Sequence, residues 1–353
     1  MKKLIHIVGN RPQFVKLAVL YNHIAKHSNI IQEIIHTGQH YDYSMSDIFF
    51  EELSIPKPTY NFNIQASQNL FIGEATDKLE QYFASQKDSV VLVYGDTNTT
   101  MAAAIAAKRT NTKLIHFEAG VRTYENTMPE EINRIITDRL ADVNYCCTSK
   151  NMDTMFAEGY NNAIPTDVIL TGDLMLDAYN KIAAAKENIT PEINYVACTV
   201  HRAANLSSKE NLTNIIAALN EINKTMAVVM PVHPHTQKKI NEYELVPTFT
   251  LLPALGYPTM KRLMLDAAYV ITDSGGTSRE AYFSKKKSLI LMDTPFWPEI
   301  LEVNCSINTN VTANNIVADF EKMKMLSPNF ETAIFGDGKA ADKILTHLKA
   351  YLQ

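Results

Sequence analysis

Short apolar runs recur along this chain, each followed by a polar loop and then by apolar residues at helical spacing. The first run, 3–8, ends at Gly9-Asn10-Arg11-Pro12, and helical spacing follows from Phe14 to Lys26. Regular alternation of strand and helix is typical of parallel sheets with right-handed crossovers. Further runs of this kind lie at 30–36, 89–94, 113–117, 143–148, 168–171, 195–199, 226–232, 269–272 and 288–292.

The length of 353 residues favours two domains, because one hydrophobic core rarely grows so large. We therefore predict two Rossmann-like, doubly wound α/β domains, with the polar loops at the strand ends facing one cleft. The boundary is expected within 173–191, along a helix predicted for 174–187. The predicted domains are 1–175 and 176–339, and a last helix, 340–353, can pack back on the first domain.

Composition excludes several classes of function. A net charge of −5, with 46% hydrophobic and 20% charged residues, is typical of a globular enzyme and argues against nucleic acid or an anionic membrane as partner. We expect no transmembrane helix, because no apolar run approaches eighteen residues, and the apolar run at the N-terminus is too short for a signal peptide. These features favour a cytoplasmic protein.

No metal site is expected. The four cysteines lack CxxC spacing, so we expect buried free thiols in a reducing compartment. His233-Pro234-His235 has poor chelating geometry, because a proline separates the two imidazoles and no acid follows at ligand spacing.

Three acids follow neighbouring strands of the first predicted sheet, or begin the helix beyond. Asp96 and Glu118 stand at strand ends, and Glu130 opens the helix after the second of these strands. Strand ends are where open α/β sheets bind ligands. Carboxylates gathered in a cleft raise one another's pKa, which suits proton transfer near neutral pH. We therefore predict acid/base chemistry for this cluster.

The alternative for the same acids is structural, as salt bridges with Arg122 and Arg134. Both interpretations can hold, since the arginines would fix the acids in place. Glu131 is the weaker candidate for catalysis, because a helix turns it about 100° from Glu130.

A phosphate site is predicted in the second domain. Ser274-Gly275-Gly276 lies between a strand and a helix, where free backbone N–H groups and the helix dipole attract anions. Glu280, one turn on, could bind ribose hydroxyls. Arg11, Lys16 and His201-Arg202 could reach a diphosphate. The structural alternatives are an ordinary N-capped turn, surface charge and a histidine that caps a strand.

Seven short motifs occur in order along the chain. They are Gly9-Asn10-Arg11-Pro12, Thr37-Gly38-Gln39-His40, Gly95-Asp96-Thr97, Glu118-Ala119-Gly120-Val121-Arg122, Pro129-Glu130-Glu131-Ile132-Asn133-Arg134, Thr199-Val200-His201-Arg202 and Asp273-Ser274-Gly275-Gly276. Together they resemble the non-hydrolysing UDP-N-acetylglucosamine 2-epimerase family, from residue 3 to about residue 300. The resemblance implies a glycosyltransferase-B-like pair of domains, usually a homodimer, and inversion at C2 of a UDP-linked 2-acetamido sugar without NAD or another cofactor.

The resemblance also implies roles. A base removes the C2 proton as UDP leaves C1, and a 2-acetamidoglycal and UDP stay trapped before proton and UDP return. The implied catalytic residues are Asp96, Glu118, Glu130 and His201. The implied substrate-binding residues are Arg11, Lys16, Gln39, His40, Arg122, Arg134, Arg202, Ser274, Gly275, Gly276 and Glu280.

The chain departs from the family pattern in the second domain. The motif His-Arg-x-Glu-Asn reads His201-Arg202-Ala203-Ala204-Asn205, and the late Arg and Glu positions hold Met292 and Phe296. The stretch 39–58 and Trp297 resemble the branch that acts on UDP-2,3-diacetamido-hexuronic acids of bacterial surface polysaccharides. This substrate is the leading alternative. A hydrolysing epimerase, a glycosyltransferase and an inactive UDP-sugar-binding homologue are further alternatives.

Overall fold

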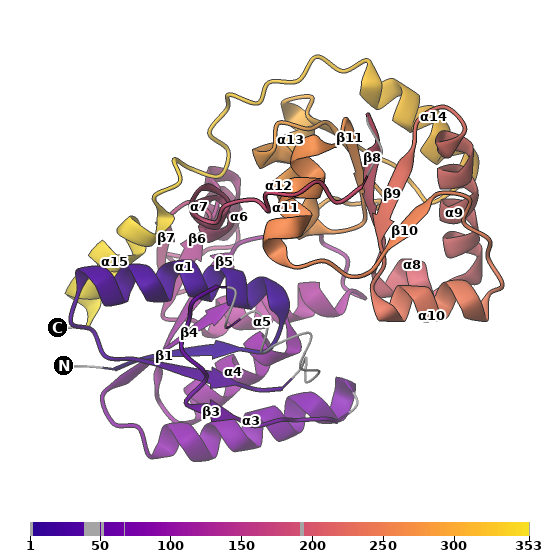
Figure 1. Ribbon diagram of the computed structural model, residues 1–353. Helices are drawn as coiled ribbons and strands as arrows, with labels where there is room; N and C mark the ends of the chain where they lie inside the picture. Colours follow the sequence, from indigo (N-terminus) through magenta and orange to yellow (C-terminus); the bar gives the residue numbers. More distant parts are fainter. Residues whose placement is uncertain (1–2, 39–49, 51–52, 67, 191–193, 353) are drawn as a thin grey trace. The chain divides into compact units, whose positions relative to one another are not determined.

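The computed structural model describes residues 3–38, 50, 53–66, 68–190 and 194–352, with only the backbone of Arg11, Gln68 and Asn69. The predicted site residues Gln39 and His40, and most of the helix predicted for 46–53, lie outside these residues. The chain forms two compact units (Figure 1). Unit 1 contains 1–181 and 333–353, and unit 2 contains 182–332.

Unit 1 is built on a parallel sheet of seven strands in the order β3-β2-β1-β4-β5-β6-β7. Central strands such as β4 are buried along their whole length, which explains their continuous apolar sequence. The strands are β1 Lys3–Val8, β2 Gln32–His36, β3 Tyr60–Asn61, β4 Ser89–Tyr94, β5 Lys113–Ala119, β6 Val143–Cys146 and β7 Asp167–Leu170.

In the described part of unit 1, seven helices follow or flank these strands. The alanine-rich α4 buries most of its residues, because small side chains allow it to approach the sheet closely. Helix α1 begins with a capping box, in which Asn10 and Gln13 bind each other's backbone N–H groups. The helices are α1 Arg11–His27, α3 Gln68–Ala84, α4 Asn98–Arg109, α5 Pro129–Leu140, α6 Ser149–Ala157, α7 Leu174–Lys181 and α15 Ala340–Tyr351.

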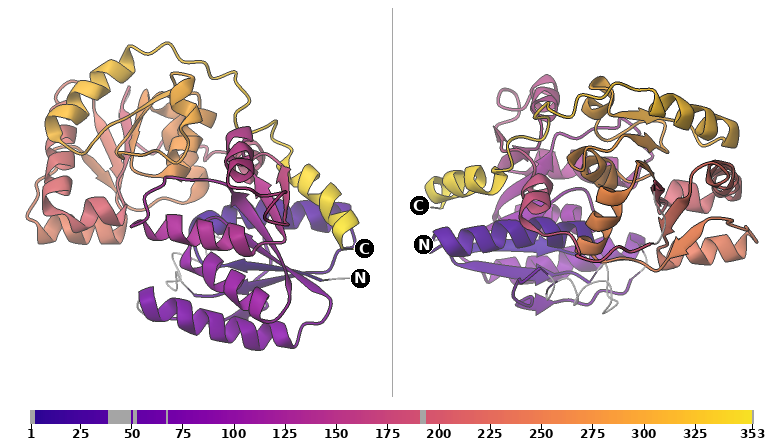
Figure 2. Two further views of the ribbon diagram at one scale, coloured as in Figure 1. Left: turned by 180° about the vertical axis from the view of Figure 1, so that it is seen from behind. Right: turned by 45° about the horizontal axis from the view of Figure 1, so that its top comes forward.

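Helix α15, at the end of the chain, returns to unit 1 and lies beside α1, as Figures 1 and 2 both show. The buried carboxylate of Asp177 on α7 accepts the backbone N–H groups of Ala340 and Ala341, at 3.0 and 2.9 Å. These are orphan donors of the first turn of α15, so Asp177 caps this helix. The hydroxyl of Tyr145 lies 2.7 Å from Nδ1 of His347.

Unit 2 has a parallel sheet of six strands in the order β10-β9-β8-β11-β12-β13. Its apolar core includes Ile215, Leu219 and Phe320. The strands are β8 Val196–Thr199, β9 Val228–Pro231, β10 Thr250–Leu252, β11 Tyr269–Thr272, β12 Ser288–Ile290 and β13 Ser306–Asn308. The helices are α8 Ala203–Ser207, α9 Lys209–Asn223, α10 Pro234–Glu242, α11 Tyr257–Asp266, α12 Gly275–Phe283, α13 Glu299–Glu302 and α14 Ala313–Lys324.

The prediction of two parallel α/β sheets is confirmed. The helix predicted for 174–187 was too long, because α7 ends at Lys181. Beyond it, the carbonyl of Ile182 accepts from Lys261, and the N–H of Ala185 donates to Pro258. All four cysteines are buried and free, as predicted. No helix in the described part of the chain is long and apolar enough to cross a membrane.

Candidate active site

Glu118 lies near the end of β5, and its carboxylate binds the ammonium group of Lys16 from α1. Only 9% of Glu118 and 3% of Lys16 are exposed. A buried charge requires a partner, and each group of this ion pair supplies one to the other. The contact joins two residues for which the sequence predicted different roles. Glu118 was predicted to take part in acid/base chemistry, and Lys16 was predicted to bind a diphosphate.

The backbone at Glu118 is left-handed, with φ of 76°. The pairing of β5 with β6 shifts register between Phe117 and Ala119, on either side of Glu118. An irregularity of this kind re-aims a side chain at the end of a strand. A non-glycine residue in this region costs about 1–2 kcal/mol, and such residues cluster at functional sites.

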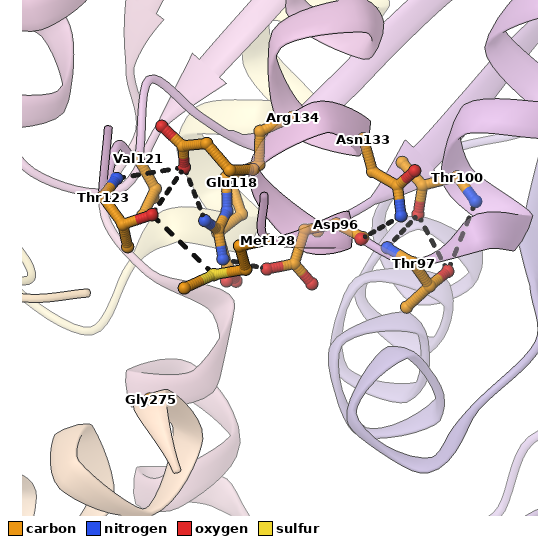
Figure 3. A network of polar contacts seen from close by, with 12 residues as sticks. Asp96, Thr97, Thr100, Glu118, Val121, Thr123, Met128, Asn133, Arg134 and Gly275 are labelled. Carbon is orange, nitrogen blue, oxygen red and sulfur yellow. Dashed lines mark hydrogen bonds and ion pairs between the residues drawn. The ribbon is translucent and has the colours of Figure 1, made fainter. Parts of the chain in front are cut away.

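Asp96, in the loop after β4, accepts from the guanidinium group of Arg134 on α5 (Figure 3). The backbone carbonyl of Asp96 also accepts from Asn133 Nδ2 at 2.9 Å. Two successive residues of α5 therefore hold this loop. The position of Arg134 beside an acid agrees with its predicted role as a positioning partner.

Glu131 is completely buried and accepts four hydrogen bonds. They come from the N–H and hydroxyl of Thr123, from the N–H of Tyr124, and from Arg134 at 3.0 Å. With these four hydrogen bonds, the carboxylate of Glu131 holds the loop before α5 in place. Its neighbour Glu130 is half-buried, and none of the hydrogen bonds or ion pairs of the described residues involves its side chain. This contrast keeps Glu130, rather than Glu131, as the candidate for proton transfer.

The prediction that Arg122 pairs with Glu118 or Glu130 was wrong. Its guanidinium group binds Asp138 at 2.7 Å and Glu158 at 2.8–2.9 Å. Burial lowers the pKa of Arg122, but the attraction of these two carboxylates outweighs burial and raises it. Sequence spacing could not show this, because both acids lie further along the chain.

The buried carboxylate of Asp138 connects His116, Gly120 and Arg122. One oxygen lies 2.6 Å from His116 Nδ1, and the other accepts from Arg122 and from the N–H of Gly120. His116 Nε2 lies 2.7 Å from the carbonyl of Gly95, directly before Asp96. Burial raises the pKa of Asp138, but Arg122 and His116 outweigh burial, and the net pKa is lowered.

Two further residues, Cys147 and Asp173, lie close to Glu118 and were not predicted as site residues. One side-chain ligand atom of each of the three lies within 4.8 Å of the others. Cys147 follows β6 and Asp173 follows β7, and both are completely buried. The order of β5, β6 and β7 in the sheet is the signal that unites them, and the sequence alone did not reveal it.

In unit 2, Ser274 caps α12, and its side chain accepts from the N–H of Thr277 at 3.3 Å. The next residues, Gly275 and Gly276, occupy the first turn, where helical N–H groups have no intrahelical acceptor. The ring of Phe296 covers Gly275, since a Cβ atom there would lie 2.5 Å from its Cδ2. The turn is therefore shaped for glycine and offers N–H groups to an anion.

The His201-Arg202 turn is fixed by Asp273, which is completely buried. Its carboxylate accepts the N–H of His201 at 3.0 Å and that of Arg202 at 2.9 Å. Half of the His201 side chain is exposed, and its Nδ1 lies 3.7 Å from Asp273. The imidazole therefore stands at the strand end, as predicted for a residue that meets a ligand.

Two residues that depart from the family pattern, Met292 and Phe296, both contact Arg202. Its guanidinium group lies over the ring of Phe296, with its carbon 5.0 Å from the centroid, and donates to Met292 Sδ at 3.1 Å. On α12, Glu280 is buried and attracts the ammonium group of Lys261. Burial lowers the pKa of Lys261 by more than this attraction raises it, so the net pKa is lowered.

Arg11 and His233 are two further residues that the sequence singled out. Arg11 begins α1, and its side chain is not among those described. His233 caps α10, and its Nδ1 accepts from the N–H of His235 at 3.3 Å.

Both parallel α/β units carry charged and polar side chains at their strand ends, where open α/β sheets bind ligands. The family model described as UDP-N-acetylglucosamine 2-epimerase matches residues 22–349. The chain belongs to this family. The resemblance expected from the sequence is thereby confirmed, as is its glycosyltransferase-B-like fold.

Relatives and solved structures agree over nearly the whole chain. A UDP-N-acetylglucosamine 2-epimerase homolog of Methanococcus maripaludis is 38% identical, covering 98% of this chain and 99% of the relative. A UDP-2,3-diacetamido-2,3-dideoxy-D-glucuronate 2-epimerase of Pseudomonas aeruginosa is 34% identical with the same coverage. The structure of Methanocaldococcus jannaschii UDP-GlcNAc 2-epimerase, in complex with UDP-GlcNAc and UDP, superposes with a TM-score of 0.92 at 32% identity and 99% coverage of both chains.

Proposed function

We propose that the chain inverts C2 of a UDP-linked 2-acetamido sugar, of the UDP-GlcNAc to UDP-ManNAc type, by elimination and re-addition of UDP. The observation that carries this proposal is the left-handed, buried Glu118 with its carboxylate on Lys16. Such a carboxylate, held at a strand end near a second acid, is suited to moving a proton.

In the proposed reaction, a carboxylate base takes the C2 proton and the C–H electron pair forms the C1=C2 double bond. The bond from C1 to the diphosphate oxygen breaks, and UDP leaves with that electron pair. A proton then adds to the other face of C2, and UDP adds back to C1. Two acids are required for protons on two faces, and Glu118, Glu130 and Asp96 are the candidates.

We assign the binding of UDP to unit 2. Support comes from the N–H groups of Gly275 and Gly276, from His201 at the neighbouring strand end, and from Glu280 as the ribose ligand that the resemblance implies. Arg11 and Lys16 of unit 1 are implied diphosphate ligands. The contact with Glu118 gives Lys16 a second task besides this one.

Proton NMR of a UDP-sugar panel in deuterated water tests the proposal. A 2-epimerase must incorporate deuterium at C2 and equilibrate the two C2 epimers. A glycosyltransferase would leave the C2 hydrogen in place, and a hydrolysing enzyme would release the free sugar. Calorimetric binding of UDP-sugars without exchange at C2 would indicate an inactive homologue and overturn the proposal.

A second candidate substrate is a UDP-2,3-diacetamido-hexuronic acid. The P. aeruginosa relative named for such a substrate is 34% identical over 98% of this chain. Arg202, in contact with Met292 and Phe296, is a cation of unit 2 that could meet a sugar carboxylate. Exchange with the hexuronate but not with UDP-GlcNAc, and its loss in Arg202→Met, would favour this substrate.

The biological setting is also a proposal. The resemblance implies synthesis of surface polysaccharides and a homodimer, which sedimentation analysis would test. Four buried free thiols support a reducing, cytoplasmic compartment.

A further inference from the structure

Three adjacent strands of unit 1 bring Glu118, Cys147 and Asp173 together at one edge of the sheet. Their ligand atoms lie within 4.8 Å of one another, and the side chains are almost completely buried. Lys16 supplies a positive charge to Glu118. Two carboxyl groups, one thiol and one ammonium group thus lie together in the interior of unit 1.

Proton transfer explains this group better than a bound metal does. A carboxylate, a thiol and a second carboxylate could ligate a divalent ion, but Glu118 already binds the fixed cation Lys16. A metal would have to sit beside this ammonium group at a cost in repulsion. Glu118 is also one of the residues to which the family resemblance assigns acid/base chemistry.

Asp173 is held in place independently of any substrate. Its carboxylate accepts the N–H of Met175 at 2.9 Å, which caps α7, and its own N–H donates to the carbonyl of Phe335 at 3.0 Å. The cap explains why an Asp, Asn or Ser is suited to this position. It does not explain why a second carboxyl group lies beside Glu118.

We propose that Asp173 is a positioning residue that tunes Glu118 for proton transfer at C2, an inference that rests on the proposed function. A second buried carboxylate opposes the ionisation of Glu118, whereas Lys16 favours it. The two effects counteract each other and bring the proton affinity of Glu118 toward the operating pH, where a general acid or base is most effective.

Other charged groups near Glu118 are already committed to partners. Asp96 is bound to Arg134, and Asp138 lies between His116 and Arg122. Cys147 contributes a thiol to the group, which is uncharged unless it ionises. Asp173 is the acid whose carboxylate lies with Glu118 and Cys147 in one group, so it is placed to act on Glu118.

Asp173→Asn tests the proposal, because asparagine caps a helix as well as aspartate and removes only the charge. The measurement is the pH profile of deuterium exchange at C2, with the melting temperature recorded in parallel. We expect an unchanged melting temperature and a shift of the Glu118 limb by about one unit toward lower pH. The direction is the same whether Glu118 acts as base or as acid, because its pKa falls.

Asp177→Asn is the matched control, since Asp177 is a buried carboxylate on α7 that caps α15 instead. It should lower the melting temperature, because both oxygens of Asp177 accept backbone N–H groups and an amide offers only one oxygen, and it should leave the pH limb in place. An unmoved limb in Asp173→Asn, or an equal shift in both variants, would overturn the inference. Asp173→Ser, a second neutral cap, replaces Asp173→Asn if that variant does not fold.

The same experiments distinguish a failure of the proposed function from a failure of the role of Asp173. If the wild-type protein shows no exchange with any UDP-sugar, the function itself is rejected. Wild-type exchange with an unmoved limb in Asp173→Asn rejects only the role of Asp173.

Discussion

The ammonium group of Lys16 on α1 binds the carboxylate of Glu118 at the end of β5, and both side chains are buried. The pair joins the first helix of the chain to a strand that is fifth in the order of the sheet, counted from β3. Each residue depends on the other, because an isolated charge is strongly disfavoured in the interior.

Lys16→Met should remove the cation that binds the buried carboxylate of Glu118. We expect the pKa of Glu118 to rise, exchange at C2 to fall at least about 100-fold, and unfolding to become easier by about 3–5 kcal/mol. Denaturant unfolding and deuterium exchange measure the two effects. Lys108→Met, which breaks a more exposed pair with Asp142 at 2.7 Å, should cost less than about 1 kcal/mol. Equal losses in both variants would contradict the special role of the buried pair.

Glu118→Gln should abolish exchange at C2 and leave UDP binding largely intact. The amide keeps the size of the side chain but cannot take a proton as a carboxylate does. Isothermal calorimetry with UDP and NMR in deuterated water separate binding from chemistry. Retained epimerisation would remove Glu118 from the mechanism. Glu131→Gln serves as comparison, because Glu131 organises the preceding loop. It should lower the melting temperature as well as the rate.

Asp138→Asn should destabilise the protein by about 3–5 kcal/mol at pH 7, since Arg122 and His116 lose a buried partner. The pKa of Asp138 is lowered in the folded state. Its stabilisation is therefore present above the unfolded pKa of about 3.9 and is lost as pH falls through the folded pKa. The difference between wild type and variant should shrink below about pH 4 in unfolding titrations.

A constant difference across that pH range would exclude the ionised Asp138 as the cause. Asp319→Asn is the control, because its pKa is also lowered but its partner Lys322, at 2.7 Å, is exposed. We expect it to change stability by less than about 1 kcal/mol.

Gly275→Ala and Gly276→Ala should have opposite effects on stability. A Cβ at Gly275 meets the ring of Phe296 at 2.5 Å, whereas one at Gly276 meets only Ser274 Oγ at 3.6 Å. The first should cost about 1–3 kcal/mol and weaken UDP binding. The second should be neutral or stabilise by up to about 1 kcal/mol. Phe296→Ala, combined with Gly275→Ala, should recover part of the lost stability. Equal melting temperatures for the two single variants would contradict the close packing of Phe296.

Much of the fold could be predicted, because apolar runs and helical spacing are local signals. The strands β1, β4 and β5 were located to within two residues at each end. Helix α14 was missed although Ile316, Phe320 and Met323 give it a buried face. The helix after Asp173 was extended too far, because its alanines favour helix while Lys261 and Pro258 bind the backbone beyond Lys181.

The site was harder to predict, because its contacts depend on strand order. Glu118, Asp96 and Arg134 stood out from local motifs. Asp138, Glu158 and Asp173 did not, because nothing near them in sequence shows that they meet Arg122 or Glu118. Arg122, which lies close to Glu118 in the sequence, was therefore assigned the wrong partner.

The return of α15 to unit 1 has a consequence for biosynthesis. On the ribosome, all of residues 182–332 are made before 333–353 emerge, so unit 2 can fold while unit 1 still lacks a helix. The carbonyl of Phe335 that holds the N–H of Asp173, and the first turn of α15 on Asp177, arrive last. In a nascent chain, the contacts that hold the backbone of Asp173 and begin α15 can therefore form only after residues 182–332 have been made.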